Sequence, residues 1–322
     1  LVAGLIAFTV ETYGAKASLP MLRVMLSKPA EEIAGIAKAA QKLGHESLAA
    51  RKLGRFVVDS KEISSIVSTA LTQTAFLDSV TLQKNLNETT FSFDDLLSAE
   101  GATIYLVLPV DKLQTYGRWL RLLISIGIRT IARNTKNLSL PVLFMLDEFG
   151  TIGKLSAVAQ AYGLMAGLNM IIWAFVQDLV QLKRDYPDDW ETFIGNSEAV
   201  TFSNVMDQFT AEYCSKLLGK ETITNIKKEM IDKATYNSFE PYGWATQEIQ
   251  ARKGELENRG PVSRALMEPA EVRTSREDMG IIISRQGPSR FFKTLYYEDL
   301  LFSERARTVS YTHLRAHETV LD

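Results

Sequence analysis

The run Leu140-Pro141-Val142-Leu143-Phe144-Met145-Leu146-Asp147-Glu148-Phe149-Gly150 decides the fold of this chain. Five apolar residues follow the proline, and the run ends with two adjacent carboxylates before Phe149 and Gly150. Its length fits a strand that is buried on both faces, as in a parallel α/β sheet. Because ligands bind beyond the carboxyl ends of such strands, we expect a binding edge at Asp147 and Glu148. The alternative is a core strand that ends in solvated acids.

An apolar strand that ends in Asp-Glu has the pattern of the Walker B element of P-loop ATPases. In that element an aspartate positions Mg²⁺ on the nucleotide phosphates, and a glutamate orients or activates the attacking water. Gln177 is a second candidate, because it directly follows another apolar run, Met170 to Val176. A polar amide at that position can sense the γ-phosphate in ATPases of the RecA type. The alternative is that Gln177 only caps the next helix.

Composition limits the possible functions. A chain of 322 residues allows one large or two ordinary domains with a real core. The net charge of -2 gives no bulk signature of nucleic-acid binding. The single cysteine, Cys214, excludes an internal disulfide framework, fits a reducing compartment and is expected to be a small core residue. His45 is the only histidine before residue 308, which disfavours a Ser-His-Asp hydrolase.

Both ends of the sequence are unusual. The chain begins at Leu1 without an initiator methionine, and Leu1 to Val10 is too short to span a bilayer, so we expect a truncated protein. Residues 308–322 resemble a translated sequencing adaptor, so we expect them to be unstructured and exclude them from the fold. The sequence also contains no Gly-x-x-x-x-Gly-Lys-Ser/Thr loop, so the isolated fragment should bind nucleotide poorly.

The spacing of apolar residues changes near residue 103. Before that point, residues 1–88 have apolar residues at helical spacing only, and afterwards strands alternate with helices, which predicts a parallel sheet with right-handed crossovers. The predicted helices are Leu19–Leu26, Ala30–Leu43, Ile63–Leu86, Lys112–Arg133 and Lys154–Gly167, and the predicted strands are Ile104–Pro109, the opening run, Met170–Val176, Ala199–Ser203 and Met279–Ser284. We interpret residues 221–259, which are polar and weakly periodic, as a helical or partly mobile excursion.

Several other side chains have the chemistry to contact phosphate or bases, but the ordinary interpretation of each is structural. An arginine finger could come from Arg118, Arg121, Arg129, Arg133 or Arg184, although surface arginine is usually only solvated. Among the tryptophans, we expect Trp173 in the core and Trp190 in packing at the start of a short helix. The basic residues Lys227, Lys228, Lys233, Arg252 and Lys253 could meet a phosphate backbone, and a solvated charged segment is the favoured interpretation.

The ordered set of motifs resembles the type IV coupling proteins, the conjugation and type IV secretion ATPases of the TraG/TraD group. The resemblance covers roughly residues 1 to 302 and is more specific than any single motif. It is carried by Ile104–Pro109 with Leu113–Arg121, by Leu146–Gly150 with Gly153–Leu155, by Gln177–Leu179 with Gln181–Leu182, by Trp190–Asn196, by Thr210–Tyr213 with Leu217–Gly219, and by Ser263–Val272.

The resemblance implies an α/β fold: a RecA-like P-loop ATPase core with a mostly parallel sheet (residues 89–307, from Walker B onward) and part of an inserted all-α domain (residues 1–88). By position, Asp147 would be the Mg²⁺ residue, Glu148 the catalytic carboxylate and Gln177 the sensor, with ATP and Mg²⁺ as cofactors. Some members place an arginine, a proposed trans-acting finger, eleven residues before the sensor glutamine, where this chain has Ala166.

The family resemblance also implies partners and a location. The parent protein would be a homo-hexamer at the cytoplasmic face of the bacterial inner membrane, anchored by N-terminal helices that this sequence lacks. It would pass DNA, expected to be single-stranded and bound to relaxase, or a protein substrate into the type IV secretion channel. Two alternatives stay open: another RecA-like hexameric DNA translocase or secretion-assembly ATPase, and, for the fragment, a non-catalytic substrate-recognition module. The sequence does not choose between DNA and protein as substrate.

Overall fold

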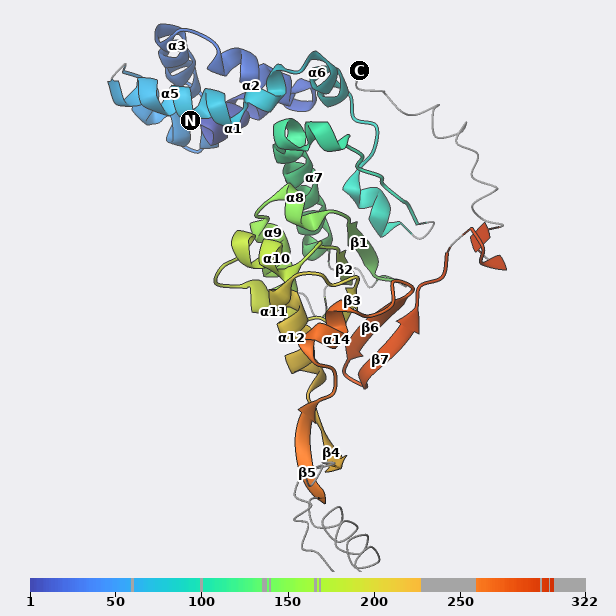
Figure 1. Ribbon diagram of the computed structural model, residues 1–322. Helices are drawn as coiled ribbons and strands as arrows, with labels where there is room; N and C mark the ends of the chain where they lie inside the picture. The colour runs from blue at the N-terminus through green and yellow to red at the C-terminus, as the bar shows by residue number, and fades with distance from the viewer. Residues whose placement is uncertain are drawn as a thin grey trace, which may run out of the picture. The chain divides into compact units, whose positions relative to one another are not determined.

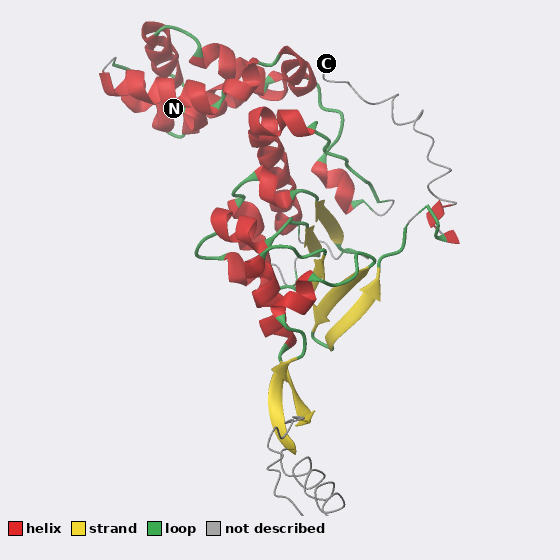
Figure 2. Ribbon diagram, in the orientation of Figure 1, coloured by secondary structure: helices red, strands yellow, loops and turns green. Residues whose placement is uncertain are grey.

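The computed structural model describes residues 1–58, 61–98, 101–134, 138, 140–164, 167, 169–226, 259–295, 297–300 and 302–303. The chain is an α/β protein that divides into two compact units between Phe175 and Val176 (Figures 1 and 2). The expected domain boundary at residue 88 stays a prediction. Among the described residues, no helix has both the length and the apolar character needed to cross a membrane.

The first unit begins with helices that share one hydrophobic core, shown in blue and cyan in Figure 1. Leu5, Leu26, Leu53 and Leu77 are at most 1% exposed in that core. The helices of this unit are α1 Val2–Tyr13, α2 Leu19–Leu26, α3 Ala30–Gln41, α4 Leu48–Leu53, α5 Lys61–Gln73, α6 Val80–Asn87, α7 Leu113–Arg133, α8 Phe149–Ile152 and α9 Ser156–Leu164, with 3₁₀ turns η1 Gly14–Lys16, η2 Gly54–Phe56, η3 Ala75–Asp78, η4 Phe93–Leu97 and η5 Val110–Lys112.

The prediction of one helix from Ile63 to Leu86 was wrong, because α5, η3 and α6 are separate. Arg23 on α2 donates to the carbonyl of Leu71 and to Thr74 Oγ1, at 2.8 and 3.0 Å, and so occupies the C-terminal end of α5. Ser79 then accepts a hydrogen bond from the Leu82 amide at 3.3 Å and caps α6. These polar groups satisfy the backbone at the two breaks, and apolar periodicity alone does not report them.

The centre of the first unit is the pair of parallel strands β1 Val142–Leu146 and β2 Met170–Ala174. Helix α7 covers the face of β1 that carries Phe144. A Cβ atom on Gly127 of α7 would lie 2.9 Å from Phe93 Cε1 and 3.3 Å from Phe144 Cε1, so glycine permits this close approach. The β1 and β2 predictions are confirmed as strands, and their parallel pairing is the expected one.

The expectation that β1 is buried on both faces was wrong for the described residues. Leu143 and Met145 are 50% and 56% exposed, and their register partners Ile171 and Trp173 are each 51% exposed. Burial instead alternates along both strands, because α7 covers one face. Trp173, which we expected in the core, lies on the other face and stacks on Phe175 with ring centroids 5.1 Å apart.

The segment Ile104–Pro109 was also predicted as a strand, but no ladder pairing is assigned to it. Its side chains nevertheless alternate between half-buried and exposed, with Tyr105 and Val107 79% and 75% exposed. The run thus has the period of a strand with one covered face. The apolar residues predict this alternation. They do not show which other segment would form hydrogen bonds with the backbone, and such hydrogen bonds define a strand.

The second unit combines short helices with two antiparallel sheets. Strands β3, β6 and β7 form a sheet in that order, and β4 pairs with β5 (Figure 2). The predicted strands Ala199–Ser203 and Met279–Ser284 are confirmed as β3 and β6, which pair antiparallel. The elements of this unit are α10 Leu179–Asp185, α11 Trp190–Gly195, α12 Gln208–Leu218, α14 Pro269–Arg273, β3 Ala199–Ser203, β4 Lys220–Ile226, β5 Arg259–Ala265, β6 Met279–Ser284 and β7 Gly287–Phe292.

The interpretation of residues 221–259 as a helical or partly mobile excursion was wrong at both ends. Lys220–Ile226 and Arg259–Ala265 pair as an antiparallel ladder, with Ile223 opposite Val262. The β-branched residues of the sequence Thr-Ile-Thr-Asn-Ile favour a strand, and this signal was available in the sequence. The five basic residues from Lys227 to Lys253 lie outside the described residues, as does the tail from residue 308.

Two expectations about packing fit the structure of the second unit. Cys214 is fully buried, and burial raises the pKa of its thiol to about 11, so it is a small core residue rather than a nucleophile. Trp190 is 9% exposed and packs against Phe209 and Tyr213, with ring centroids 5.5 and 5.1 Å away. It serves packing, as expected for the first residue of a short helix.

Candidate functional site

Asp147 and Glu148 lie directly beyond the carboxyl end of β1, where the sequence placed them, and both are exposed. The Glu148 amide donates to Asp147 Oδ1 at 3.1 Å. One oxygen of Asp147 therefore orients the turn, while the carboxylate as a whole faces solvent. An exposed carboxylate at the end of a central strand is available to a ligand.

Glu148 has an unusual backbone conformation. Its φ of 49° and ψ of 38° lie in the left-handed region, which is unfavourable for a residue with a Cβ atom. It precedes α8, and its carbonyl accepts hydrogen bonds from the Thr151 amide at 2.8 Å and from Thr151 Oγ1 at 2.5 Å. The turn thus reverses the chain within one residue and aims the Glu148 side chain away from the strand direction that Asp147 follows.

The turn after β1 is anchored to the neighbouring strand. The Phe175 amide donates to the Leu146 carbonyl at 3.0 Å, and the Phe149 amide donates to the Phe175 carbonyl at 2.9 Å. The parallel ladder therefore continues past the assigned ends of β1 and β2. Phe149 is 1% exposed, and its buried side chain anchors the turn in the core. This arrangement holds the two carboxylates on a rigid element, as a catalytic edge requires.

Gln177 follows β2 by three residues and is exposed. It is not the N-cap of the next helix: Asp178 caps α10 by accepting from the Gln181 amide at 2.7 Å. The Gln177 side chain instead accepts from Gln181 Nε2 at 2.9 Å. Its proposed role as a sensor near Asp147 stays a prediction. Sequence reasoning missed Asp178 as the cap, although Asp is a preferred N-cap residue.

The arginine candidates have separate surroundings. Arg118 donates to the carbonyls of Thr72 and Gln73 at 3.0 and 3.2 Å, and Arg121 donates to the carbonyl of Ile152. Arg184 pairs with Asp185 at 3.0 Å. Arg129 and Arg133 are exposed on α7, and Ala166 lies outside the described residues. The role of an arginine finger stays a prediction for each of these residues.

The side chains near the turn could supply only part of the coordination of a Mg²⁺ ion. Among the described residues, no cluster of three or more His, Cys, Asp or Glu side chains is suited to hold a metal by itself. Mg²⁺ in nucleotide sites is instead held by one or two carboxylates together with phosphate oxygens and water. A single exposed carboxylate at Asp147 fits that mode.

A family model described as type IV secretory system conjugative DNA transfer matches residues 7–319. The chain belongs to this family. The match confirms the resemblance to type IV coupling proteins and extends into residues 308–319, whose origin from a sequencing adaptor stays a prediction.

Two curated relatives are similar in sequence. The chain is 24% identical over 319 residues to the conjugal transfer protein TraG of Escherichia coli, an alignment that covers 91% of this chain and 49% of TraG. It is 28% identical over 200 residues to the protein VirD4 of Rhizobium radiobacter, covering 61% of this chain and 27% of VirD4. The chain thus spans about half the length of TraG.

Solved structures confirm the fold. The bacterial conjugative coupling protein TrwB, in its unbound form, matches with a TM-score of 0.64 at 15% identity, covering 91% of this chain and 61% of TrwB. The structure of TrwB in complex with ADP and Mg²⁺ matches with a TM-score of 0.63 at 15% identity, covering 91% and 61%. The chain therefore shares the α/β fold of TrwB, which is the fold class that the sequence predicted.

Proposed function

We propose that this chain is part of an ATP-hydrolysing motor that drives a substrate into a type IV secretion channel. The observation that carries the proposal is the pair of exposed carboxylates after β1, held by the left-handed turn at Glu148 and the hydrogen bonds to Phe175. A rigid pair of carboxylates at the carboxyl end of a parallel strand is the geometry that Walker B chemistry needs. The ADP and Mg²⁺ bound to TrwB support the same chemistry.

Each residue has a distinct role in this proposal. Asp147 holds Mg²⁺ beside the nucleotide phosphates, and Glu148 accepts a proton from the attacking water or orients it. Gln177 donates its amide to the γ-phosphate and senses its loss. When bound beside Asp147, Mg²⁺ would supply positive charge to the nucleotide phosphates.

The rest of the active site belongs to the longer protein. The sequence contains no Gly-x-x-x-x-Gly-Lys-Ser/Thr loop, and the chain spans 49% of TraG. We therefore assign ATP binding and hydrolysis to a parent protein that supplies this loop, forms a homo-hexamer and is anchored in the inner membrane. Its substrate is DNA, single-stranded and bound to relaxase, or a protein that the same channel accepts. The names conjugal transfer protein and conjugative coupling protein, given to TraG and TrwB, favour DNA.

The test uses the longer protein, expressed with its upstream coding sequence. Glu148→Gln should reduce ATP hydrolysis by about 10² to 10⁴-fold, the range for loss of a general base, while ATP binding stays unchanged. Asp147→Asn should weaken Mg²⁺-dependent nucleotide binding as well. Gln177→Ala should lower the hydrolysis rate with little effect on binding. The matched control is Glu198→Gln, an exposed glutamate beside β3 with no bonded partner among the described residues.

Two results would refute the proposal. If Glu148→Gln hydrolysed ATP at the parental rate, the turn after β1 would be structural only. If the longer protein carried no phosphate loop and bound no nucleotide, the chain would be the non-catalytic recognition module. Normal thermal melting of each variant would exclude misfolding as the cause of a lost activity.

A further inference from the structure

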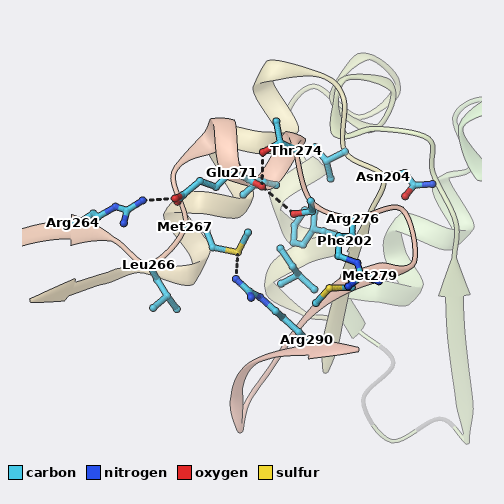
Figure 3. Close-up of a pocket in the computed structure, with 15 residues that line it drawn as sticks. Phe202, Asn204, Arg264, Leu266, Met267, Glu271, Thr274, Arg276, Met279 and Arg290 are labelled. Carbon is cyan, nitrogen blue, oxygen red and sulfur yellow. Dashed lines mark hydrogen bonds and ion pairs between the residues drawn. The ribbon is translucent and has the colours of Figure 1, made fainter. Parts of the chain in front are cut away.

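The second unit contains a pocket of about 340 Å³, whose lining residues include neither Asp147 nor Glu148 (Figure 3). Residues of β3, β6, β7, α14 and the segments around them line it. This volume is within the range of pockets that bind small molecules. All of its lining residues belong to one unit, so its shape does not depend on other parts of the chain.

The floor of the pocket is apolar and well packed. Phe202, Met267, Val272 and Ile281 are 3 to 9% exposed and form this floor. Ser215 Oγ donates to the Met267 carbonyl at 2.6 Å and ties the floor to α12. Apolar side chains of this kind can pack against the face of a planar ring.

The rim of the pocket is rich in arginine. Arg264, Arg276 and Arg290 line it, and Glu271 is the only carboxylate among its lining residues. Arg264 pairs with Glu271, whose other oxygen accepts from the Glu268 amide at 2.8 Å. Arg276 pairs with Asp278 through two hydrogen bonds, Nε to Oδ1 at 3.0 Å and Nη2 to Oδ2 at 2.6 Å. These two arginines therefore have their charges balanced.

Arg290 differs from the other two arginines. In the part of the chain that the structure describes, its hydrogen bond is to Met267 Sδ at 3.5 Å, and it forms no salt bridge (Figure 3). A thioether sulfur is a weak acceptor, and a guanidinium group has five N–H donors. Arg290 also interacts electrostatically with Glu271, but that carboxylate already pairs with Arg264, so one carboxylate serves two arginines. Most N–H donors of Arg290 therefore have no acceptor among the described residues.

The amide of Asn204 adds a second donor. Its side-chain oxygen accepts from Lys293 Nζ at 2.7 Å, so its NH₂ group is the remaining hydrogen-bonding group of the amide. Asn204 is held at φ 51°, a left-handed conformation that asparagine tolerates better than most residues. The pocket therefore is lined by an excess of arginine over carboxylate, by an amide and by apolar side chains, which together suit an anion attached to a planar apolar body.

We propose that this pocket binds a nucleotide unit, with its phosphate on Arg290 and its base on the apolar floor. A phosphate offers the guanidinium of Arg290 more acceptor oxygens and more negative charge than a carboxylate, which has two oxygens. An extended acidic peptide would need a longer groove than 340 Å³ provides. The same chemistry is present in a free mononucleotide and in one residue of a single-stranded nucleic acid. The inference does not depend on hydrolysis at Asp147 and Glu148.

The test measures binding by the 322-residue chain with titration calorimetry, in EDTA so that no Mg²⁺ site contributes. The probes are thymidine 5′-monophosphate, thymidine, inorganic phosphate, an oligothymidylate and a hexaglutamate peptide. Arg290→Gln should weaken binding of thymidine monophosphate by about tenfold or more, as expected for loss of a charge-assisted hydrogen bond. Arg285→Gln is the matched control, because Arg285 is exposed beside the same hairpin and does not line the pocket.

The probes separate the outcomes. Tighter binding of thymidine monophosphate than of the oligothymidylate supports a free nucleotide, and the reverse order supports a strand. Binding of thymidine monophosphate that Arg290→Gln does not weaken would overturn the proposal, as would no binding of either nucleotide probe. Binding of hexaglutamate in place of both nucleotides would also overturn it in favour of an acidic peptide. Arg290→Lys, which keeps the charge, should retain part of the affinity and would show that the site still folds. Loss of binding in Asp147→Asn would point to the Walker B edge and so separate the two sites.

Discussion

Glu148 combines the two properties that define a candidate catalytic residue in this chain, an exposed carboxylate and a strained backbone. Its φ is 49°, and among the residues that the structure describes, the other non-glycine residues with a positive φ are Asn169 and Asn204. Asparagine occupies the left-handed region readily, whereas glutamate does not. Strain of this kind persists where the surrounding structure determines it, and here the Phe149 and Thr151 hydrogen bonds do so.

This strain predicts that Glu148→Gly stabilises the folded chain. Glycine adopts the left-handed conformation without a Cβ clash, so we expect the free energy of unfolding to rise by roughly 0.5 to 1 kcal/mol after the loss of chain entropy is included. Glu148→Ala keeps a Cβ atom and serves as the control, with a change within about 0.5 kcal/mol. Urea unfolding measures both variants. Equal stability of the glycine and alanine variants would contradict the strain.

At the residue scale, the sequence predicted the polar side chains that come directly after an apolar run. It did not predict the side chains whose role depends on tertiary neighbours. Asp147 and Glu148 could be placed because an apolar run ended in acids. Arg290 could not, because its significance comes from its tertiary neighbours Met267 and Glu271, which are distant in the sequence. No local pattern in the sequence reports which arginine shares its carboxylate with another.

At the scale of elements, the Arg23 and Asp78 pair joins α2 to the turn between α5 and α6. Arg23 Nε donates to Asp78 Oδ1 at 2.6 Å, and this hydrogen bond with Arg23 holds the pKa of Asp78 below its ordinary value. The side chain of Arg23 is 12% exposed and that of Asp78 is 57% exposed. The pair therefore sits at the edge of the helical core, where one partner is shielded and the other meets solvent.

The lowered pKa of Asp78 predicts how pH changes the stability of the helices. Because the folded-state pKa lies below the unfolded value near 3.8, the stabilisation is complete above that value and is lost as pH falls through the folded pKa. We expect Asp78→Asn to reduce the free energy of unfolding by about 1 kcal/mol at pH 7. The difference from the parent chain should shrink below pH 4 and vanish in stronger acid. Urea unfolding at several pH values measures it, and a difference that is constant with pH would contradict the ion pair.

Elements with strong apolar runs were predictable, and elements defined by pairing or by polar contacts were not. Ala199–Ser203 and Met279–Ser284 were predicted with the observed bounds, because each is an apolar run between polar or turn residues. The long helix predicted after Ile63 was wrong, because Arg23 comes from a distant helix to end α5. Trp173 was placed in the core because a sequence cannot report which face of a strand its own helices leave exposed.

At the scale of the whole chain, α7 links the helical region to the carboxylate turn. Arg118 on α7 donates to the carbonyls of Thr72 and Gln73 at the end of α5. Three residues later, Arg121 donates to the carbonyl of Ile152 at the end of α8, close to Gly153. Burial is the main cause of a lowered pKa at Arg121, followed by repulsion from Arg118, but arginine remains charged. One helix thus holds both regions through two neighbouring side chains.

This arrangement predicts that Arg121 positions the turn without touching nucleotide. Arg121→Met keeps an unbranched apolar stem but removes the donor to Ile152, so amide hydrogens of Phe149 to Ile152 should exchange faster. In the longer protein, ATP hydrolysis should fall by roughly 10 to 100-fold while ATP affinity stays within about twofold, because a small displacement of Glu148 affects the reaction more than binding. Arg129→Met on the exposed side of α7 is the control and should change neither quantity. Equal loss of ATP affinity and hydrolysis, or unchanged exchange in α8, would show that Arg121 serves only the packing of α7.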